Sequence, residues 1–93
     1  MANYKFDGEN LKLNGRRMAR INRDRILDDK GRSAGRFKDE KIYDAKGRSA
    51  GRFDGRYLFD GKGRRIADRR QIEKDIDGNG GTSLAALWLL FVR

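Results

Sequence analysis

The sequence contains no cysteine, no histidine and no proline. Without cysteine, neither disulfides nor thiolate metal sites can hold the fold together. Without histidine, the chain lacks the usual general base near neutral pH and the commonest metal ligand. Proline would interrupt the hydrogen bonding of interior strands, so its absence agrees with a chain of paired strands. These absences argue for a backbone architecture rather than for catalysis.

Charged residues dominate this short chain. Its 93 residues are 40% charged and 37% hydrophobic, with a formal net charge of +9. A chain of this length forms one domain with a small core, and the composition alone leans toward disorder. Residues 1–70 hold 21 Lys/Arg against 11 Asp/Glu. Such a basic body favours anionic partners, such as nucleic acid or an acidic protein or membrane surface, although solubility alone also accounts for it.

A repeat of 16 residues overrides the leaning toward disorder, because regular copies indicate a repeated supersecondary unit. The dipeptide Gly-Arg recurs at residues 15–16, 31–32, 47–48 and 63–64. The copies read ILDDKGRSAGRF (26–37), IYDAKGRSAGRF (42–53) and LFDGKGRRIA (58–67). In each copy, Asp-x-Lys-Gly predicts a type I turn closed by a left-handed glycine, which makes a hairpin with a bulge. The Asp carboxylate is expected to bond the backbone two residues on.

The predicted turns determine which residues face each other across a hairpin. In the third copy, Tyr43 would face Ser49 and Ile42 would face Ala50. Each copy would also pair an acidic with a basic residue: Asp28 with Arg32, Asp44 with Arg48, and Asp60 with Arg64. Opposite charges across strands contribute a few tenths to about 1 kcal/mol. Nearer the N-terminus, Asp7-Gly8 and Asn14-Gly15 predict two-residue hairpin turns.

Small and bulky residues recur at fixed places in the copies. The small residues are Ala19, Ala34, Gly35, Ala50, Gly51 and Ala67, and the bulky ones are Leu27, Tyr43, Phe59, Ile21, Phe37 and Phe53. Small-against-large packing around a common centre fills a closed or radial β arrangement and removes exposed edges. A flat sheet with these residues split across two faces is the alternative. We therefore predict an all-β meander of four tandem hairpins, about eight strands in total.

The repeated Tyr/Phe-Asp turn, followed by Gly and then Gly-Arg-Phe, resembles the repeats of small bacterial proteins called four-fold β-flower proteins. The resemblance covers roughly residues 4–69. It implies four hairpins around a pseudo-four-fold axis, and it transfers no functional residue because the family's function is not established. Over a few residues per copy, the chain also resembles the YD repeats of large secreted shell proteins, whose units are longer.

The repeat ends near residue 70, so residues 1–70 are predicted to be the β-hairpin domain. Residues 71–82 are predicted to be a linker, with a short helix over residues 69–76 and a flexible Gly-rich breaker over residues 77–81. Residues 83–93 are predicted to be an apolar helix. Its nine apolar residues, 84–92, would span about 13 Å, whereas a membrane-spanning helix needs about 20 residues.

The apolar segment is expected to pack on the β body as a terminal helix or strand that caps its open end. Self-association with a second copy or binding to another protein is the alternative, followed by shallow contact with a membrane surface. The side chains that would carry the packing or the self-association are Leu84, Leu87, Trp88 and Phe91.

One stretch of the linker resembles a metal site. Asp75, Asp77 and Asn79, followed by Gly80, match the first half of an EF-hand calcium loop. The position of the bidentate Glu is occupied by Ala86. The sequence therefore predicts weak calcium binding at best, and a plain Gly-rich linker is the simpler interpretation.

Arginine forms two rows along the copies. The first row is Arg16, Arg32, Arg48 and Arg64, and the second is Arg20, Arg36 and Arg52. Arginines beside aromatic rings on strands can follow a phosphate backbone and stack on bases. A solvated charged face on a repeat protein explains the same rows.

The sequence shows no nucleotide-binding loop, and most of its carboxylates belong to turns, so we predict no catalytic residue and no cofactor. We expect a non-catalytic structural or protein-interaction module, with non-specific nucleic-acid binding by the arginine rows as the alternative. The N-terminus lacks the basic start and apolar run of a secretory signal, so we expect a cytoplasmic location.

Overall fold

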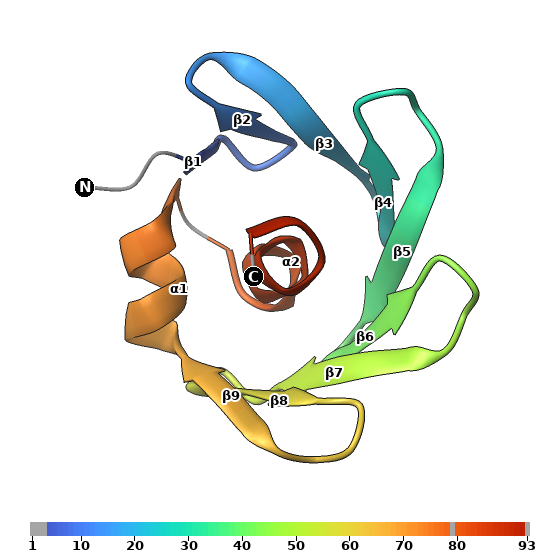
Figure 1. Ribbon diagram of the computed structural model, residues 1–93, viewed down its shortest axis with the longest axis vertical. Coiled ribbons are helices and arrows are strands. Elements are labelled where there is room, and N and C mark those ends of the chain that lie inside the picture. The colour runs from blue at the N-terminus through green and yellow to red at the C-terminus, as the bar shows by residue number, and fades with distance from the viewer. Residues whose placement is uncertain (1–3, 79, 93) are drawn as a thin grey trace.

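The computed structural model describes residues 4–78 and 80–92. Within them, a ten-stranded sheet curls around a helix at the C-terminus (Figure 1). The strands are β1 (Tyr4–Phe6), β2 (Asn10–Leu13), β3 (Arg16–Asn22), β4 (Arg25–Asp28), β5 (Ser33–Lys38), β6 (Lys41–Asp44), β7 (Ser49–Phe53), β8 (Tyr57–Asp60), β9 (Arg65–Asp68) and β10 (Ile76–Gly78). The helices are α1 (Arg69–Asp75), α2 (Thr82–Leu87) and the π-helical turn η1 (Trp88–Val92), which continues α2.

The sheet forms an incomplete ring. Strands β1 to β9 follow one another in antiparallel order, and β10 returns to pair in parallel with β1. Strands β9 and β10 are the two ends of the sheet, and α1 lies in the gap between them (Figure 1). The predicted all-β repeat fold with a short C-terminal helix is confirmed, but the sheet is not closed by hydrogen bonds.

The chain after residue 75 differs from the predicted breaker. Residues 76–78 form β10: all three pair with β1, and Ile76 is fully buried. Gly78 lies so close to Phe6 that an added Cβ would sit 3.0 Å from the Phe6 Cβ. This short strand and β1 raise the number of strands above the eight that the repeats alone predicted. The predicted short helix is confirmed as α1.

The same irregularity occurs in each of the four hairpins. The strand register shifts directly after four fully buried residues: Leu11, Ile26, Ile42 and Leu58. Each of them faces a small residue on the next strand: Ala19, Gly35, Gly51 and Ala67, respectively. A bulge bends its strand and increases the local twist. Four bulges at equivalent places therefore curl the sheet into a ring.

The bulges also correct part of the predicted pairing. Tyr43 faces Ser49 as predicted, but Ile42 faces Gly51 instead of Ala50. The reason is the register shift between Ile42 and Tyr43, which leaves Ala50 as the extra residue of the bulge.

The predicted core is displaced by one residue along the outgoing strands. The residues directly before Leu27, Tyr43 and Phe59 are the ones that are fully buried. Because neighbouring side chains of a strand point to opposite faces, Leu27, Tyr43 and Phe59 lie on the outer side of the ring, where they are half-buried. Of the predicted return-strand residues, Phe53 is buried, whereas Ile21 and Phe37 are half-buried against the core.

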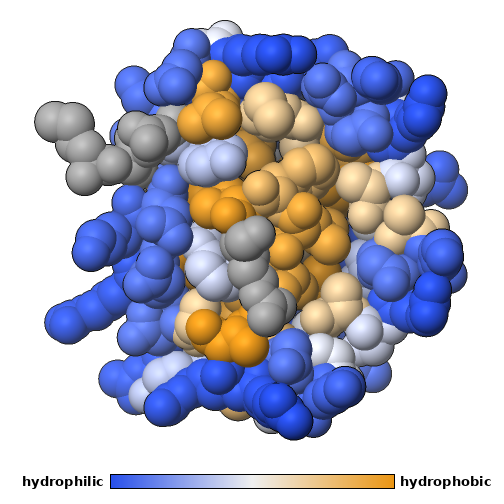
Figure 2. All heavy atoms as spheres, in the orientation of Figure 1, coloured by the Kyte–Doolittle hydropathy of each residue, from blue (hydrophilic) through white to orange (hydrophobic). Residues whose placement is uncertain are grey.

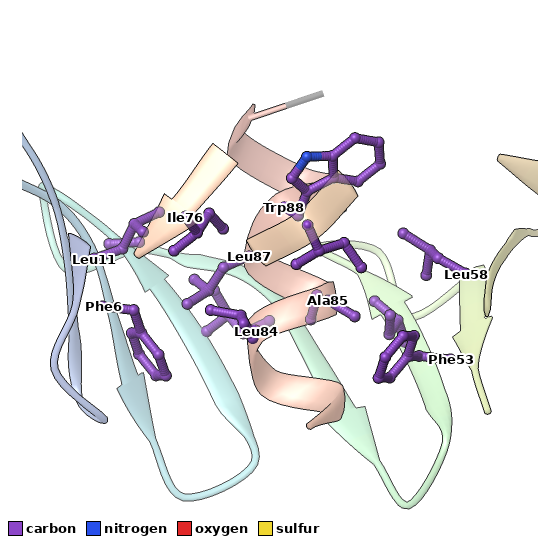
Figure 3. Close-up of a cluster of buried hydrophobic side chains, with 14 residues drawn as sticks. Phe6, Leu11, Phe53, Leu58, Ile76, Leu84, Ala85, Leu87 and Trp88 are labelled. Carbon is purple, nitrogen blue, oxygen red and sulfur yellow. The ribbon is translucent and has the colours of Figure 1, made fainter. Parts of the chain in front are cut away.

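The core lies between the inner side of the ring and the central helix (Figure 3). Leu84 of α2 points toward Phe6 and Leu11, while Ala85 points toward Phe53 and Leu58 (Figure 3). Burying a large apolar side chain contributes about 1.5–3 kcal/mol. The apolar segment thus supplies the centre of the core instead of covering one end of it.

Polar contacts hold the central helix at two levels. At its start, the Thr82 hydroxyl donates to the carbonyl oxygen of Asp39 in the β5–β6 turn, at 2.5 Å. Farther along, Trp88 Nε1 donates to Oδ2 of Asp75 in α1, at 2.7 Å. The helix therefore has a fixed position and direction inside the ring.

Two kinds of turn alternate along the meander. We call β2–β3, β4–β5, β6–β7 and β8–β9 the hairpin turns, and β1–β2, β3–β4, β5–β6 and β7–β8 the linking turns. The predicted turn at Asn14-Gly15 is confirmed, with φ of 52° and 85°. The turn predicted at Asp7-Gly8 lies one residue later, because the Asp7 N–H donates to the Asn10 carbonyl oxygen at 3.2 Å and encloses Gly8-Glu9.

Aspartates organise three of the hairpin turns. Oδ1 of Asp44 accepts the backbone N–H groups of Lys46 and Arg48, each at 2.9 Å. Asp28 and Asp60 accept the equivalent pairs, also at 2.9 Å. The predicted bond to the backbone two residues on is confirmed. In each predicted Asp–Arg pair, the Asp carboxylate therefore accepts a hydrogen bond from the backbone N–H of the Arg.

These hydrogen bonds favour the charged carboxylate. The backbone N–H of Arg48 holds the pKa of Asp44 below its ordinary 3.8, the N–H of Lys46 lowers it further, and partial burial opposes both. Arg32 and Lys30 lower the pKa of Asp28 in the same way. Because the pKa is depressed in the folded state, this stabilisation is present above pH 3.8 and is lost as the pH falls below it.

We expect the free energy of unfolding to fall when the pH is lowered from about 5 to about 3. The variants Asp28→Asn and Asp44→Asn remove the titrating groups but keep an oxygen that can accept the same bonds. Chemical unfolding at several pH values should give each variant a shallower pH dependence than the native chain. An unchanged slope in both variants would show that these turns do not carry the acid sensitivity.

A second prediction concerns the position of Gly51. A Cβ there would lie 2.5 Å from the Phe59 carbonyl oxygen and 2.9 Å from Leu89 Cδ2. We expect Gly51→Ala to destabilise the fold by about 1–3 kcal/mol, because overpacking displaces either the strand or the helix. The control is Ala67→Gly, the equivalent place in the fourth hairpin, which should cost about 1 kcal/mol or less. Equal stability of Gly51→Ala and the native chain in denaturant unfolding would contradict the close contact.

Candidate interaction surface

The turns at the two ends of the ring differ in charge. Within the described residues, the four hairpin turns contain six Lys/Arg and one Asp, a net charge of +5: Lys30, Arg32, Lys46, Arg48, Lys62, Arg64 and Asp29. The four linking turns contain two Arg and six Asp/Glu, a net charge of −4: Arg23, Arg56, Asp7, Glu9, Asp24, Asp39, Glu40 and Asp54. All of these residues are exposed. The strand residues that adjoin the turns reduce this difference: with Asp28, Asp44, Asp60, Arg16 and Arg65 the hairpin end carries +4, and with Arg25, Lys38 and Lys41 the linking end carries −1.

The central helix runs from the end with the linking turns toward the end with the hairpin turns. It starts at Thr82, which is bonded to the linking turn at Asp39. Its later residues Leu89 and Leu90 reach the strands at Gly51 and Gly35. A helix of this length advances about as far as a strand of five residues. The end of η1 therefore lies among the hairpin turns, and we call this end of the molecule the hairpin face.

Apolar side chains occupy the centre of the hairpin face. Leu89, Leu90, Phe91 and Val92 are half-buried and pack on the core from its edge. Figure 2 shows hydrophobic residues gathered in the middle of this face and hydrophilic residues around them. The face thus combines an apolar centre with a basic rim.

The predicted self-association residues divide between the core and this face. Leu84, Leu87 and Trp88 are 3%, 0% and 7% exposed, so they are committed to packing within the ring. Phe91 is half-buried at the hairpin face. Of the four predicted residues, Phe91 is the one placed where a partner could reach it.

The first arginine row lies at the hairpin face. Arg32, Arg48 and Arg64 belong to the hairpin turns, and Arg16 starts β3 directly after one of them. Arg16 lies 3.9 Å from Asp29 and keeps 79% of its side chain exposed. The lysines of these turns were not predicted as binding residues from the sequence, although the repeated Lys-Gly-Arg pattern places a lysine beside each of these arginines.

The second arginine row lies on the outer wall of the ring. Arg20, Arg36 and Arg52 face Leu27, Tyr43 and Phe59 across neighbouring strands. The Arg36 guanidinium carbon lies 5.1 Å from the Tyr43 ring centre, and that of Arg52 lies 4.7 Å from the Phe59 ring centre. These cation–π contacts give the wall a repeated cationic and aromatic surface.

The calcium candidate occupies regular structure in place of a loop. Asp75 ends α1, and its Oδ2 accepts hydrogen bonds from Trp88 at 2.7 Å and from Gln71 at 3.1 Å. Asp77 lies in β10, and Asn79 lies outside the described residues. No group of three acidic side chains suited to a metal occurs among the residues that the structure describes. Asp75 instead links α1 to the central helix.

A shallow pocket of 620 Å³ opens where the ring is incomplete. It is lined by Tyr57, Arg65, Ile66, Ala67, Asp68, Gln71 and Trp88. Its acidic residue, Asp68, accepts the backbone N–H of Gln71 at 2.9 Å and caps α1. The Arg65 guanidinium carbon lies 4.8 Å from the Tyr57 ring centre. The polar groups of this pocket thus take part in the structure of its walls.

Comparison with known proteins identifies a family. A family model described as "4-fold beta flower protein" matches residues 12–80. Comparisons with curated proteins and with solved structures found no match. No helix within residues 4–78 and 80–92 is long and apolar enough to cross a membrane. The match covers most of the chain, including all four hairpin turns, and the chain therefore belongs to the 4-fold β-flower family.

Proposed function

We propose that the protein is a small non-catalytic binding module whose contact surface for an anionic partner is the hairpin face. The observation that carries this proposal is the half-buried apolar segment Leu89–Val92 inside a rim whose net charge is +4 when the strand residues beside the turns are counted. Exposed apolar patches with polar rims are typical of interaction sites. Complementary charge steers a partner of opposite sign to such a face and sets its orientation.

The structure of the turns supports this role. The carboxylates of Asp28 and Asp44 accept backbone N–H groups of their own turns, which fixes the turn conformation. The Lys and Arg side chains of the same turns remain exposed. The cations are thus held on rigid supports and are directed to solvent, where a partner can reach them.

The assignment to one face can be tested with two variants that change the charge equally. One variant replaces Arg32, Arg48 and Arg64 by Gln at the hairpin face, and the other replaces Arg20, Arg36 and Arg52 by Gln on the outer wall. With polyglutamate as a probe of acidic partners, we expect the first variant to lose at least about tenfold in affinity, because a few desolvated charge contacts account for such a change. The second variant should lose much less.

Thermal melting of both variants confirms that they are folded before titration calorimetry is performed. Equal losses in the two variants would show that polyglutamate responds to the total charge of the chain, and the assignment of the contact surface to the hairpin face would then be wrong.

The outer wall suggests a second candidate function, the binding of single-stranded nucleic acid. Its support is the stacked pairs Arg36–Tyr43 and Arg52–Phe59, since arginine and aromatic planes are used to hold bases and phosphates. For this function, affinity for an oligonucleotide should fall steeply with salt and should be lost in the outer-wall variant. Retention of oligonucleotide binding in that variant would exclude it.

A further inference from the structure

We propose that the hairpin face docks on an anionic lipid bilayer, with Leu89–Val92 entering the headgroup region and the basic hairpin turns contacting the lipid headgroups. This inference rests on the proposed function, because it names the partner of the same face.

The arrangement of the face matches a bilayer interface. Peripheral segments bury apolar groups about 5–10 Å deep and keep Lys and Arg at the level of the headgroups. In this chain the apolar centre is the end of the central helix, and the cations sit on turns around it (Figure 2).

The separation of charge selects the orientation. An anionic bilayer attracts the hairpin end, which carries +4 when the adjoining strand residues are counted, more strongly than the linking end, which carries −1. This difference turns the apolar residues Leu89–Val92 toward the lipid. Juxtamembrane basic clusters bind anionic lipids by this long-range attraction, which salt screens.

A second copy of the chain fits this face less well. A face-to-face dimer would bring two rims of the same positive sign together. A head-to-tail contact would avoid this repulsion, but the linking turns contain only polar and charged residues and glycine, so they offer no apolar surface to cover Phe91 and Val92.

An acidic protein also suits this face less well than a bilayer does. The rim repeats Lys-Gly-Arg in three turns and presents cations on several sides of one centre. A fluid lipid surface can supply an anion to each cation without a fixed pattern, whereas a protein partner must match their positions.

The test is vesicle co-sedimentation with the full chain. The vesicles contain either phosphatidylcholine alone or about 70% phosphatidylcholine and about 30% phosphatidylserine. We expect binding to the anionic vesicles, weak or no binding to the neutral ones, and a steep loss of binding with added salt. The hairpin-face variant (Arg32, Arg48 and Arg64 to Gln) should bind anionic vesicles at least tenfold more weakly, and the outer-wall variant should bind nearly as well as the native chain.

The apolar contribution is tested by Phe91→Ser at unchanged charge, which should weaken vesicle binding severalfold. Because Phe91 also packs on the core, a second measurement uses the native chain. Spin-labelled lipid in the anionic vesicles should broaden the amide signals of Leu89–Val92 and of the hairpin turns, but not those of the linking turns. Broadening of the linking turns instead would overturn the proposed orientation.

The other outcomes separate this inference from the proposed function. Binding to polyglutamate without binding to anionic vesicles would leave the contact surface in place and overturn the membrane. A dimer in sedimentation equilibrium that Phe91→Ser abolishes, without vesicle binding, would identify a second copy as the occupant. Equal loss of vesicle binding in the two triple variants would overturn both proposals.

Discussion

The close approach of the strands to one another and to the central helix is the constraint on which the fold depends. Ile26 and Ile42 are fully buried and face Gly35 and Gly51, which have no side chain. An added Cβ at either glycine would meet both a neighbouring strand and a leucine of the helix. Since interiors are close-packed and tolerate little extra volume, these positions set the width of the ring.

The position of the helix connects the fold to the candidate surface. Thr82 and Trp88 hold the helix to the β5–β6 turn and to α1, so its last residues cannot move freely along the ring. The residues Leu89–Val92 are consequently presented at the end where the hairpin turns lie. The same alternation of turns that builds the meander places basic turns at this end and acidic turns at the other. Fold and charge separation thus have one origin.

Much of the architecture could be predicted from the sequence because it is written in local patterns. The recurring Asp-x-Lys-Gly indicated the hairpin turns, since their geometry depends on one glycine and one carboxylate within five residues. The phase of the core could not be predicted, because Ile42 and Tyr43 are adjacent bulky residues and only the tertiary packing, in which Ile42 is fully buried, determines which of them points inward. Strand β10 was missed because it pairs with β1, which is more than 70 residues away in the sequence.

The candidate site was only partly visible in the sequence. The first arginine row and Phe91 were named, but their position on one face follows from the direction of nine antiparallel strands and of the helix, which no local motif encodes. The three residues predicted with Phe91 are buried because the helix fills the ring. Asp75 looked like a metal ligand, whereas its nearest partners are side chains of Trp88 and Gln71, one of them 13 residues away.

The ring and the apolar helix are expected to unfold together, because they share one core. Native-state hydrogen exchange tests this cooperativity directly by comparing the backbone amides of Ala85–Leu87 with those of Ile26, Ile42 and Leu58. If the ring requires the helix, both sets exchange only through global unfolding, with the same free energy of opening. If the helix amides exchange with a much lower free energy while the strand amides stay protected, the helix leaves an intact ring, and a single cooperative core is contradicted.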